Sequence, residues 1–335
     1  MNRSDDEQWN SELWAFHQFR LYYQAGLVLV GSLGNGALIL YYVFHPSVRA
    51  VSVTAYLFGL AISDLFFLLT LSLILLEPLG LAWPSVPGAC KSAYYAWYLT
   101  TFLSAWFTCA MSAERCLAVY RPFVAHRRTL RPTLLTITII TLIGALFNLW
   151  ILLMVERKAA QEQCGETALA LRYYNIGNWL DTLGTFALPL FGIPICNGLT
   201  ALKLLRSHYQ RYTLASLHQP YFYHRMALRR NALNTAGQNA ADYRSELRIT
   251  WTLLATSMAY ALLNLPSYTL RLYADLFAPE PSSRLMVAVE TSRLIFYTHF
   301  SINFIIYFAS SSCGRANAPP RYFGKKEPSY WLIYQ

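Results

Sequence analysis

Seven long apolar stretches alternate with polar connectors along the chain. Each stretch has about 20 residues or more, which is the length that crosses a bilayer core as a helix. A backbone in lipid must satisfy its own hydrogen bonds, so we expect helices rather than single strands. The predicted fold class is therefore an all-α membrane protein, a seven-transmembrane helix bundle. The predicted spans are Leu21–Phe44, Thr54–Leu76, Lys91–Val119, Thr133–Met154, Asn178–Leu205, Arg248–Leu272 and Leu285–Phe308.

The stretch from Cys90 to Arg115 differs in chemistry between its two ends. It opens on a cysteine and closes on the adjacent charges Glu114 and Arg115. A helix over these residues would be roughly 37 Å long, enough to cross the membrane with some tilt. Such a span suggests a protein that passes information across the membrane rather than a simple anchor.

Composition supports the membrane assignment. The 335 residues are 55% hydrophobic and 13% charged, whereas a soluble domain usually carries about a quarter charged residues. The net charge of +10 could suggest nucleic acid, but the basic residues collect in alternate connectors, as the positive-inside rule describes. We expect no nucleic-acid partner, an extracellular N-terminus, a cytosolic C-terminus and a multi-pass protein of the plasma membrane. The basic residues concerned are Arg121, Arg127, Arg128, Arg131, Lys203, Arg206, Arg211, Arg225, Arg229, Arg230, Arg244, Arg248, Arg315, Arg321, Lys325 and Lys326.

The predicted organisation is one membrane domain with two flanking segments. Residues 1–20 form an extracellular N-terminus, residues 21–308 the seven-helix domain, and residues 309–335 a cytosolic tail. A polar, basic stretch at about 206–245 is expected to be a long cytosolic loop with helical ends. Asn2 begins a weak glycosylation sequon, Asn2-Arg3-Ser4, at the N-terminus.

Six cysteines divide between the two sides. Cys90 and Cys164 both fall on the outer, oxidising side, where a disulfide is plausible. Cys313 follows the last span and is either palmitoylated or unmodified. Three cysteines in apolar or inner positions are expected to stay free: Cys109, Cys116 and Cys196.

Polar residues and prolines inside the spans need an explanation, because burying a polar group in lipid is costly. A proline within a span removes a helix hydrogen bond and produces a kink. The residues that stand out are Asn35, Asp64, Glu114, Arg115, Asn303, Pro189 and Pro266.

Several short motifs follow one another along the spans. They are Gly34-Asn35, Leu60-Ala61-Ile62-Ser63-Asp64, Cys90 followed by Glu114-Arg115-Cys116, Val119-Tyr120-Arg121-Pro122, Phe186-Ala187-Leu188-Pro189 and Asn303-Phe304-Ile305-Ile306-Tyr307. With these motifs in this order and at the family's spacing, the sequence resembles the rhodopsin-like (class A) G-protein-coupled receptors over nearly its whole length. The last of these motifs is also similar to the ending of invertebrate RFamide-type neuropeptide receptors. The resemblance implies an extracellular ligand, a heterotrimeric G protein as partner, a disulfide between Cys90 and Cys164, and no enzymatic activity.

The resemblance also implies an inner-face lock. Arg115 would pair with Glu246, which lies twenty positions before Pro266. The alternative is that Glu246 is a solvated charge between Arg244 and Arg248. The residues expected to act in the switch or in G-protein coupling are Glu114, Arg115, Glu246, Asn264, Pro266, Asn303 and Tyr307.

A sodium ion at Asp64 is a further implication of the resemblance. Ser104, Asn35 and Asn303 occupy the matching positions, and a carboxylate deep in a membrane needs a cation or a proton. The alternative is a protonated or hydrogen-bonded structural aspartate. No cofactor is otherwise expected.

The sequence departs from the family pattern at several positions. Asn264 stands where the sixth span usually has a tryptophan, Phe304 replaces the proline of the seventh, and Asn197 replaces the inner tyrosine of the fifth. His299 occupies a position that is more often asparagine. We expect Pro266 to keep a hinge and Asn264 to extend the polar network of Asp64.

Candidate ligand contacts fall in the outer third of the spans. They are Glu77, Trp97, Tyr98, Asp181, Tyr268, Arg271, Glu290 and Arg293. An amine ligand is disfavoured, because Trp97 replaces the acid that the resemblance would require. Arginines suit carboxylates or carbonyls, and aromatic residues suit peptide side chains, which together favour a peptide. The alternative is that the charges neutralise one another and the aromatic residues are interfacial anchors.

Three other functions compete with a signalling receptor. A non-signalling relative or decoy would bind ligand without activating a G protein, as Asn264 and Phe304 could allow. A transporter often has inverted repeats, and none is visible in the sequence. An intramembrane enzyme would need closely placed catalytic groups, whereas Asp64, Ser104 and His299 are scattered.

Overall fold

The computed structural model describes the backbone of residues 3–45, 52–76, 83–121, 130–158, 163–217, 226–277 and 282–315. Within these ranges, side chains are described except at residues 3–13, 76, 163, 171, 174, 208–217, 226–250, 253 and 309–315.

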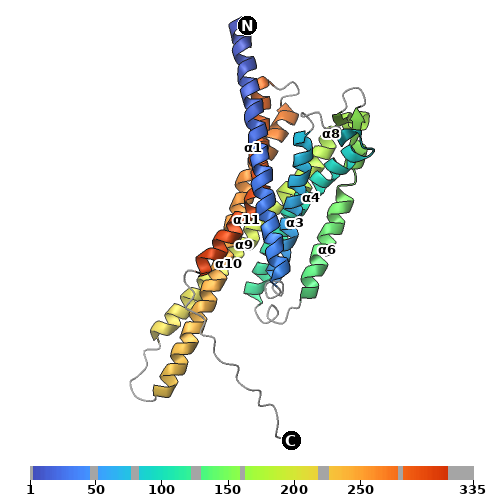
Figure 1. Ribbon diagram of the computed structural model, residues 1–335. Coiled ribbons are helices and arrows are strands. Elements are labelled where there is room, and N and C mark those ends of the chain that lie inside the picture. Colours follow the sequence, from blue (N-terminus) through green and yellow to red (C-terminus); the bar gives the residue numbers. More distant parts are fainter. Residues whose placement is uncertain are drawn as a thin grey trace.

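Seven long helical rods form the described part of the chain and pack side by side in one elongated bundle (Figure 1). The predicted all-α seven-helix fold is thus confirmed. Some rods combine several helices: α6 is followed by the short α7, and α8 runs through the π-helical turn η3 into α9. The bounds are α1 Arg3–Phe44, α3 Ser52–Leu76, α4 Ala89–Tyr120, α6 Leu130–Phe147, α7 Ile151–Met154, α8 Ala168–Asp181, η3 Thr182–Ala187, α9 Leu188–Leu217, α10 Met226–Phe277 and α11 Ser283–Arg315.

Four helical stretches among the described residues are long and apolar enough to cross a membrane by length and composition. They are Trp14–Phe44, Ser52–Leu75, Leu130–Met154 and Asn175–Ser207. The other three rods, α4, α10 and α11, carry buried polar side chains that interact within the bundle, such as Ser104, Asn264 and Asn303.

A two-stranded antiparallel hairpin interrupts the helices between α7 and α8. Its strands are β1, Val155–Lys158, and β2, Gln163–Glu166, with Arg157 opposite Cys164. The hairpin was not predicted, because its short, charged strands lack the alternation of apolar and polar residues that marks a half-buried strand. The end of the bundle that contains the hairpin and Cys90 is called the disulfide end, and the opposite end of α4 the Arg115 end.

Pro189 shapes the backbone where α8 passes into α9. The N–H of Leu188 bonds to the carbonyl of Leu183, five residues earlier, instead of to that of Gly184. Pro189 has no N–H to offer to the carbonyl of Thr185. Side chains from two other helices donate instead: the Trp106 indole bonds to the Gly184 carbonyl at 2.9 Å, and the Tyr260 hydroxyl to the Thr185 carbonyl at 3.1 Å. The bulge therefore joins α4, α9 and α10.

The middle of the bundle is filled by aromatic rings. Phe67 of α3 and Phe300 of α11 are fully buried and stack with ring centroids 3.6 Å apart. Trp97 of α4 lies against Phe67 at 4.7 Å and against Tyr297 at 5.3 Å. These rings close the bundle below a cavity at the disulfide end.

Candidate functional site

A cavity of about 450 Å³ opens at the disulfide end of the bundle. It is lined from α1, α3, α4, α7, β1, β2, α8, α10 and α11, so most of the rods contribute to it. Pockets of roughly 300–1,000 Å³ with mainly apolar walls and a few polar groups are typical ligand sites. Seven of the eight predicted ligand residues line this cavity, namely Trp97, Tyr98, Asp181, Tyr268, Arg271, Glu290 and Arg293. The eighth, Glu77, lies outside the described residues.

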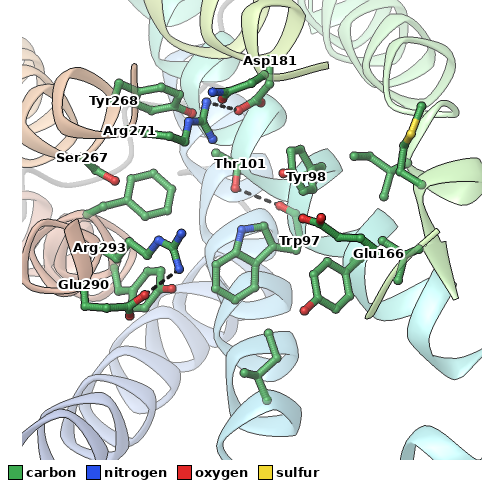
Figure 2. Close-up of a pocket in the computed structure, with 18 of the residues that line it drawn as sticks. Trp97, Tyr98, Thr101, Glu166, Asp181, Ser267, Tyr268, Arg271, Glu290 and Arg293 are labelled. Atoms are coloured by element: carbon green, nitrogen blue, oxygen red, sulfur yellow. Dashed lines mark hydrogen bonds and ion pairs between the residues drawn. The ribbon is translucent and has the colours of Figure 1, made fainter. Parts of the chain in front are cut away.

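Trp97 lies across the middle of the cavity (Figure 2). Arg293 and Glu290 of α11 lie on one side of it, and Glu166 of the hairpin lies on the other. The indole ring packs against Phe67 and Tyr297, which holds it in place. Thr101, one turn later, donates to the Trp97 carbonyl at 2.8 Å. The cavity thus has an aromatic wall flanked by charged residues.

Arg271 and Asp181 form an ion pair between α10 and α8. Nη2 of Arg271 lies 2.7 Å from Oδ2 of Asp181 and 2.9 Å from the hydroxyl of Thr182. The guanidinium also lies over the Tyr268 ring, 4.7 Å from its centroid. The two charged side chains are 22% and 5% exposed, so this pair is largely removed from water and ties the two helices together.

Glu290 of α11 is shared by two arginines. Its Oε1 lies 2.8 Å from Nη1 of Arg293, and its Oε2 lies 3.4 Å from Nη1 of Arg20 on α1. The four predicted charged residues thus pair with one another within the protein, and their contact with a ligand stays a prediction. Arg20 was missed by the sequence analysis because it precedes the first apolar run and has no motif around it.

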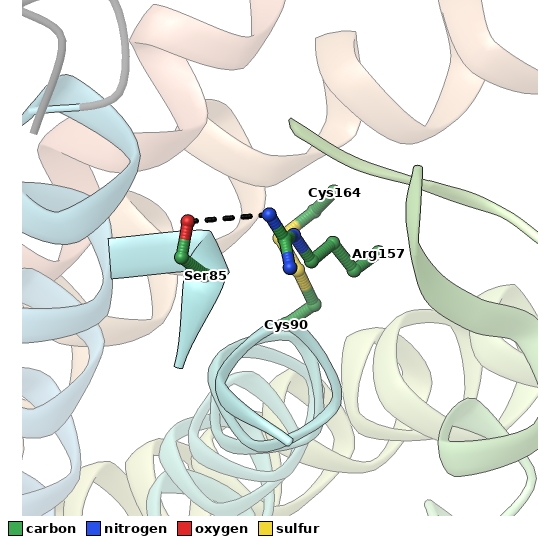
Figure 3. Close-up of a disulfide and its surroundings, with 4 residues drawn as sticks. All are labelled: Ser85, Cys90, Arg157 and Cys164. Atoms are coloured by element: carbon green, nitrogen blue, oxygen red, sulfur yellow. Dashed lines mark hydrogen bonds between the residues drawn. A yellow bond between two sulfur atoms is a disulfide. The ribbon is translucent and has the colours of Figure 1, made fainter. Parts of the chain in front are cut away.

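The disulfide holds the hairpin beside the cavity. Cys90 at the start of α4 is bonded to Cys164 in β2, with Cα atoms 5.5 Å apart (Figure 3). This confirms the predicted pairing. Next to the disulfide, Arg157 donates to Ser85 at 3.4 Å, and Glu166 of β2 lines the cavity. The hairpin is therefore one wall of the cavity.

A second polar cluster lies deeper, around the fully buried Asp64 of α3. Its Oδ1 accepts a hydrogen bond from Ser104 at 3.0 Å and its Oδ2 from Asn303 at 2.8 Å. Asn35 donates to the carbonyls of Gly31 and Phe300, both at 3.0 Å. The four residues predicted for a sodium site thus lie on four helices that converge in the core.

The donor set at Asp64 fits a hard cation. Such ions take carboxylate, carbonyl and hydroxyl oxygens, and the amide oxygens of Asn35 and Asn303 are buried without a hydrogen-bond partner. Among the described side chains, no three His, Cys, Asp or Glu residues gather as they would around a transition metal.

Asn264 does not extend this network as expected. It is 2% exposed, and its amide donates to the carbonyl of Tyr260 in its own helix at 2.6 Å instead of to Asp64. The side chain of an asparagine in a helix can reach the backbone carbonyl one turn earlier, and here it bonds to this local partner rather than to Asp64. Pro266 lies inside α10, as predicted.

At the Arg115 end, Glu114 accepts a hydrogen bond from Thr133 of α6 at 3.4 Å. Tyr307 of α11 is buried and interacts with Thr256 of α10. Besides Glu77, three other residues named in the sequence analysis, Glu246, Cys313 and Asn2, lie outside the described side chains. The predicted lock between Arg115 and Glu246 therefore stays a prediction.

Comparison with known proteins agrees with the bundle and its motifs. The sequence model of the family described as 7 transmembrane receptor (rhodopsin family) matches residues 34–307. The chain is 32% identical over 190 residues to human cysteinyl leukotriene receptor 2, covering 52% of each protein. It is 28% identical over 185 residues to rat leukotriene B4 receptor 2, covering 52% of this chain and 49% of the relative. It is 30% identical over 125 residues to bovine type-1 angiotensin II receptor, covering 37% and 34%.

The chain thus matches about half the length, or less, of these curated relatives. None of the three is named as an RFamide-type receptor, so that finer resemblance is not supported by them. The family match covers most of the chain and includes at least part of every rod of the bundle. The chain belongs to the rhodopsin family of seven-transmembrane receptors, as a multi-pass protein of the plasma membrane and not an enzyme.

Proposed function

We propose that this protein binds an extracellular ligand in the cavity at the disulfide end and activates a heterotrimeric G protein at the Arg115 end. The observation that carries this proposal is the position of α4. Trp97, near one end of this helix, lines the cavity, and Arg115 lies five turns further along. The proposed orientation places the N-terminus and hairpin outside the cell and the basic connectors inside.

The ligand acts by binding one conformation more tightly than the other. α10 carries Pro266 next to the cavity residues Ser267 and Tyr268. A proline in a helix lacks one backbone hydrogen bond, so the helix bends most easily there. We propose that bending of α10 separates Glu246 from Arg115 and opens the surface that meets the G protein.

For the ligand, an extracellular peptide of the neuropeptide kind is our first candidate. The aromatic lining suits peptide side chains, and the arginines suit a carboxylate. One of the relatives is named for angiotensin II, and two for leukotrienes. The latter favour a second candidate, an acidic lipid, whose carboxylate would use the same arginines.

A sodium ion at Asp64 is part of the proposal. Ser104, Asn303 and Asn35 would share its coordination with the carboxylate. Ser104 and Asn303 already contact Asp64, and the amide oxygens of Asn303 and Asn35 are buried without a hydrogen-bond partner. The carboxylate has no counter-ion among the described side chains. The ion would supply that positive charge, and the protein residues would fix its place between α3, α4, α11 and α1.

A receptor relative that binds ligand without coupling is the second candidate function. It is favoured by two observations on the helices that would move. Phe304 replaces a proline, and α11 continues as one helix from Ser283 to Arg315. The amide of Asn264 is bonded within α10.

A G-protein dissociation assay in cells that express the receptor tests the proposal. A peptide library and an acidic-lipid library are applied, with surface expression measured for every sample. A ligand response that disappears in Arg115→Gln at equal surface expression supports signalling. A ligand that binds at the cell surface without any G-protein response supports the non-signalling relative instead.

A further inference from the structure

The three arginines of the cavity are not equivalent in charge. Among the described side chains, Arg271 forms an ion pair with Asp181 alone, donates a hydrogen bond to the hydroxyl of Thr182, and is mostly buried. Its charge is matched and its position is fixed. Arg20 and Arg293, in contrast, have the single carboxylate of Glu290 between them. Counted over the described side chains, two positive charges against one negative leave one positive charge on this wall of the cavity.

The two arginines on this wall keep N–H donors that the described part of the protein does not use. A guanidinium has five N–H donors, and Arg20 and Arg293 each direct one nitrogen to Glu290. A second nitrogen of Arg20, Nη2, lies 3.3 Å from Nδ1 of His17. The Arg293 side chain is 46% exposed and points into the space between Glu290 and Trp97 (Figure 2). Nε of Arg20 is buried without a hydrogen-bond partner, so this arginine has unused capacity in the protein itself.

Among the described side chains, the other charged residues nearby do not cancel this charge on the cavity wall. Asp275 interacts electrostatically with Arg271 and Arg293, but it accepts a hydrogen bond from Asn178 and is not among the lining residues. Glu166 lines the cavity from the hairpin, on the far side of Trp97 from Arg293 (Figure 2). Among the described lining residues, the positive charge is thus at the α1–α11 wall, and the hairpin contributes the carboxylate of Glu166 on the other side of Trp97.

We propose that Arg20, Glu290 and Arg293 form an anion subsite that takes one carboxylate of the ligand, whose apolar or aromatic body then lies along Trp97. Glu290 aligns the two guanidiniums from α11 and α1 and limits the net charge to one, which selects a singly charged acid over a phosphate or a dianion. The subsite deepens the proposed function and rests on it for the role of the ligand.

The charge of the subsite is measured without knowing the ligand. Leu21 lines the cavity next to Arg20, and Leu21→Cys places a thiol there. Its reaction with the anionic reagent 2-sulfonatoethyl methanethiosulfonate is compared with that of the cationic 2-(trimethylammonio)ethyl reagent. Each rate is divided by the rate of the same reagent with a free thiol in solution, which removes the difference in intrinsic reactivity. The receptor without the introduced cysteine measures the reaction of its own cysteines, which is subtracted. Gln24→Cys, also on the cavity wall, is the second reporter should Leu21→Cys fold poorly.

We expect the anionic reagent to react faster by about fivefold, since one unit charge within about 10 Å changes local ion concentrations several-fold. Arg293→Gln or Arg20→Gln should bring the ratio of the two rates close to one, and Glu290→Gln should raise it. Arg157→Gln is the matched control, because it removes the same charge from the neighbouring exposed hairpin outside the cavity lining. It should leave the ratio unchanged. A ratio at or below one, or a ratio that ignores both arginine variants, would overturn the proposal.

Two simple acids then distinguish the source of the carboxylate. Millimolar decanoate and N-acetyl-phenylalanyl-phenylalanine are tested for protection of the thiol, each against its own carboxamide. Protection by an acid but not by its amide supports the subsite, and stronger protection by decanoate points to a lipid, by the dipeptide to a peptide terminus. Equal protection by acid and amide, or none by either acid, would refute it.

These measurements separate the subsite from the signalling proposal. A receptor with the expected rate ratios but no G-protein response to any ligand keeps the anion subsite and rejects signalling. A receptor that signals but reacts equally fast with the two reagents keeps the signalling proposal and rejects the anion subsite.

Discussion

At the scale of single residues, close contacts between helices decide which side chains the chain tolerates. Gly34 of α1 faces Phe304 of α11, and a Cβ on Gly34 would overlap the phenylalanine ring. Gly36, two residues later, has open space around its Cβ position. In this structure, the glycine at position 34 leaves the room that the Phe304 ring occupies.

Gly34→Ala should destabilise the protein by about 1–3 kcal/mol, because the added methyl overpacks this contact. The measurement is thermal unfolding of the purified receptor in detergent. Gly36→Ala is the control and should not lower the midpoint. Phe304→Leu in the Gly34→Ala background should restore part of the stability, and equal midpoints for the two alanine variants would contradict the contact.

Sodium should stabilise the protein through Asp64. We expect the midpoint of unfolding to be a few degrees higher in sodium chloride than in choline chloride, since a ligand bound only by the native state adds stability. Asp64→Asn removes the charge that holds the ion and should abolish the difference. Thr70→Ala, a change of a buried hydroxyl on the same helix that bonds only to the local carbonyl of Phe67, should keep it. A difference that survives in Asp64→Asn would argue for a hydrogen-bonded structural aspartate instead.

The sequence analysis identified most of the charged and aromatic residues that line the cavity, but it did not predict how their charges pair. Trp97, Arg271 and Arg293 were identified because a polar or aromatic residue in the outer part of a span is conspicuous. The sharing of Glu290 with Arg20 depends on how α1 and α11 lie against each other, which no single stretch of sequence records. For Asn264, the sequence analysis predicted a distant partner, the polar network of Asp64. The structure shows a local one, the backbone carbonyl of Tyr260 one turn away.

At the scale of elements, the segment from α8 through η3 to α9 shows how a helix irregularity becomes an interhelical contact. Pro189 was predicted from the sequence as a kink. The sequence did not show that two carbonyls near it would receive hydrogen bonds from Trp106 and Tyr260, because these residues are distant in sequence and each is an ordinary apolar choice for a span.

Tyr260→Phe should lower stability by about 1–2 kcal/mol, since it removes a buried hydrogen bond and leaves the Thr185 carbonyl short of a donor. Trp106→Phe should have a similar effect through the Gly184 carbonyl. Tyr273→Phe, on the exposed face of the same α10, is the control and should change nothing. Thermal unfolding of the variants measures this, and a Tyr260→Phe variant as stable as Tyr273→Phe would show that water replaces the hydroxyl.

Helix lengths were predicted less well than helix number. Apolar runs mark only the part of a helix that lipid surrounds, whereas α1 starts at Arg3, in polar sequence. α9 and α10 also extend into the stretch at about 206–245, whose ends were expected to be helical. A helix continues into water wherever its local residues allow it. The hairpin was missed altogether, since its short, charged strands lack the alternation of apolar and polar residues by which a strand is recognised.

At the scale of the whole molecule, the Cys90–Cys164 bond fixes the hairpin to the top of α4 and so completes the cavity. The chain between the two cysteines is long, with a separation of 74 residues. Closing a long loop removes much entropy from the unfolded chain, in one model of disulfide stabilisation.

Cys90→Ser and Cys164→Ser should each lower surface expression and the midpoint of unfolding, and the double variant should match either single one, because all three lack the same bond. Cys196→Ser, at a free cysteine, is the control and should have a small effect. Flow cytometry and thermal unfolding measure the two quantities. An additive loss in the double variant would mean that each cysteine contributes separately from the bond.

The stacked rings between the cavity and Asp64 have a thermodynamic consequence. Trp97 packs on Phe67, Phe67 stacks on Phe300, and Phe300 lies one turn before Asn303, which donates to Asp64. A ligand that displaces Trp97 and an ion that holds Asn303 would therefore act on the same column of rings. Linkage then requires reciprocity: by whatever factor sodium changes the affinity for the ligand, the ligand must change the affinity for sodium.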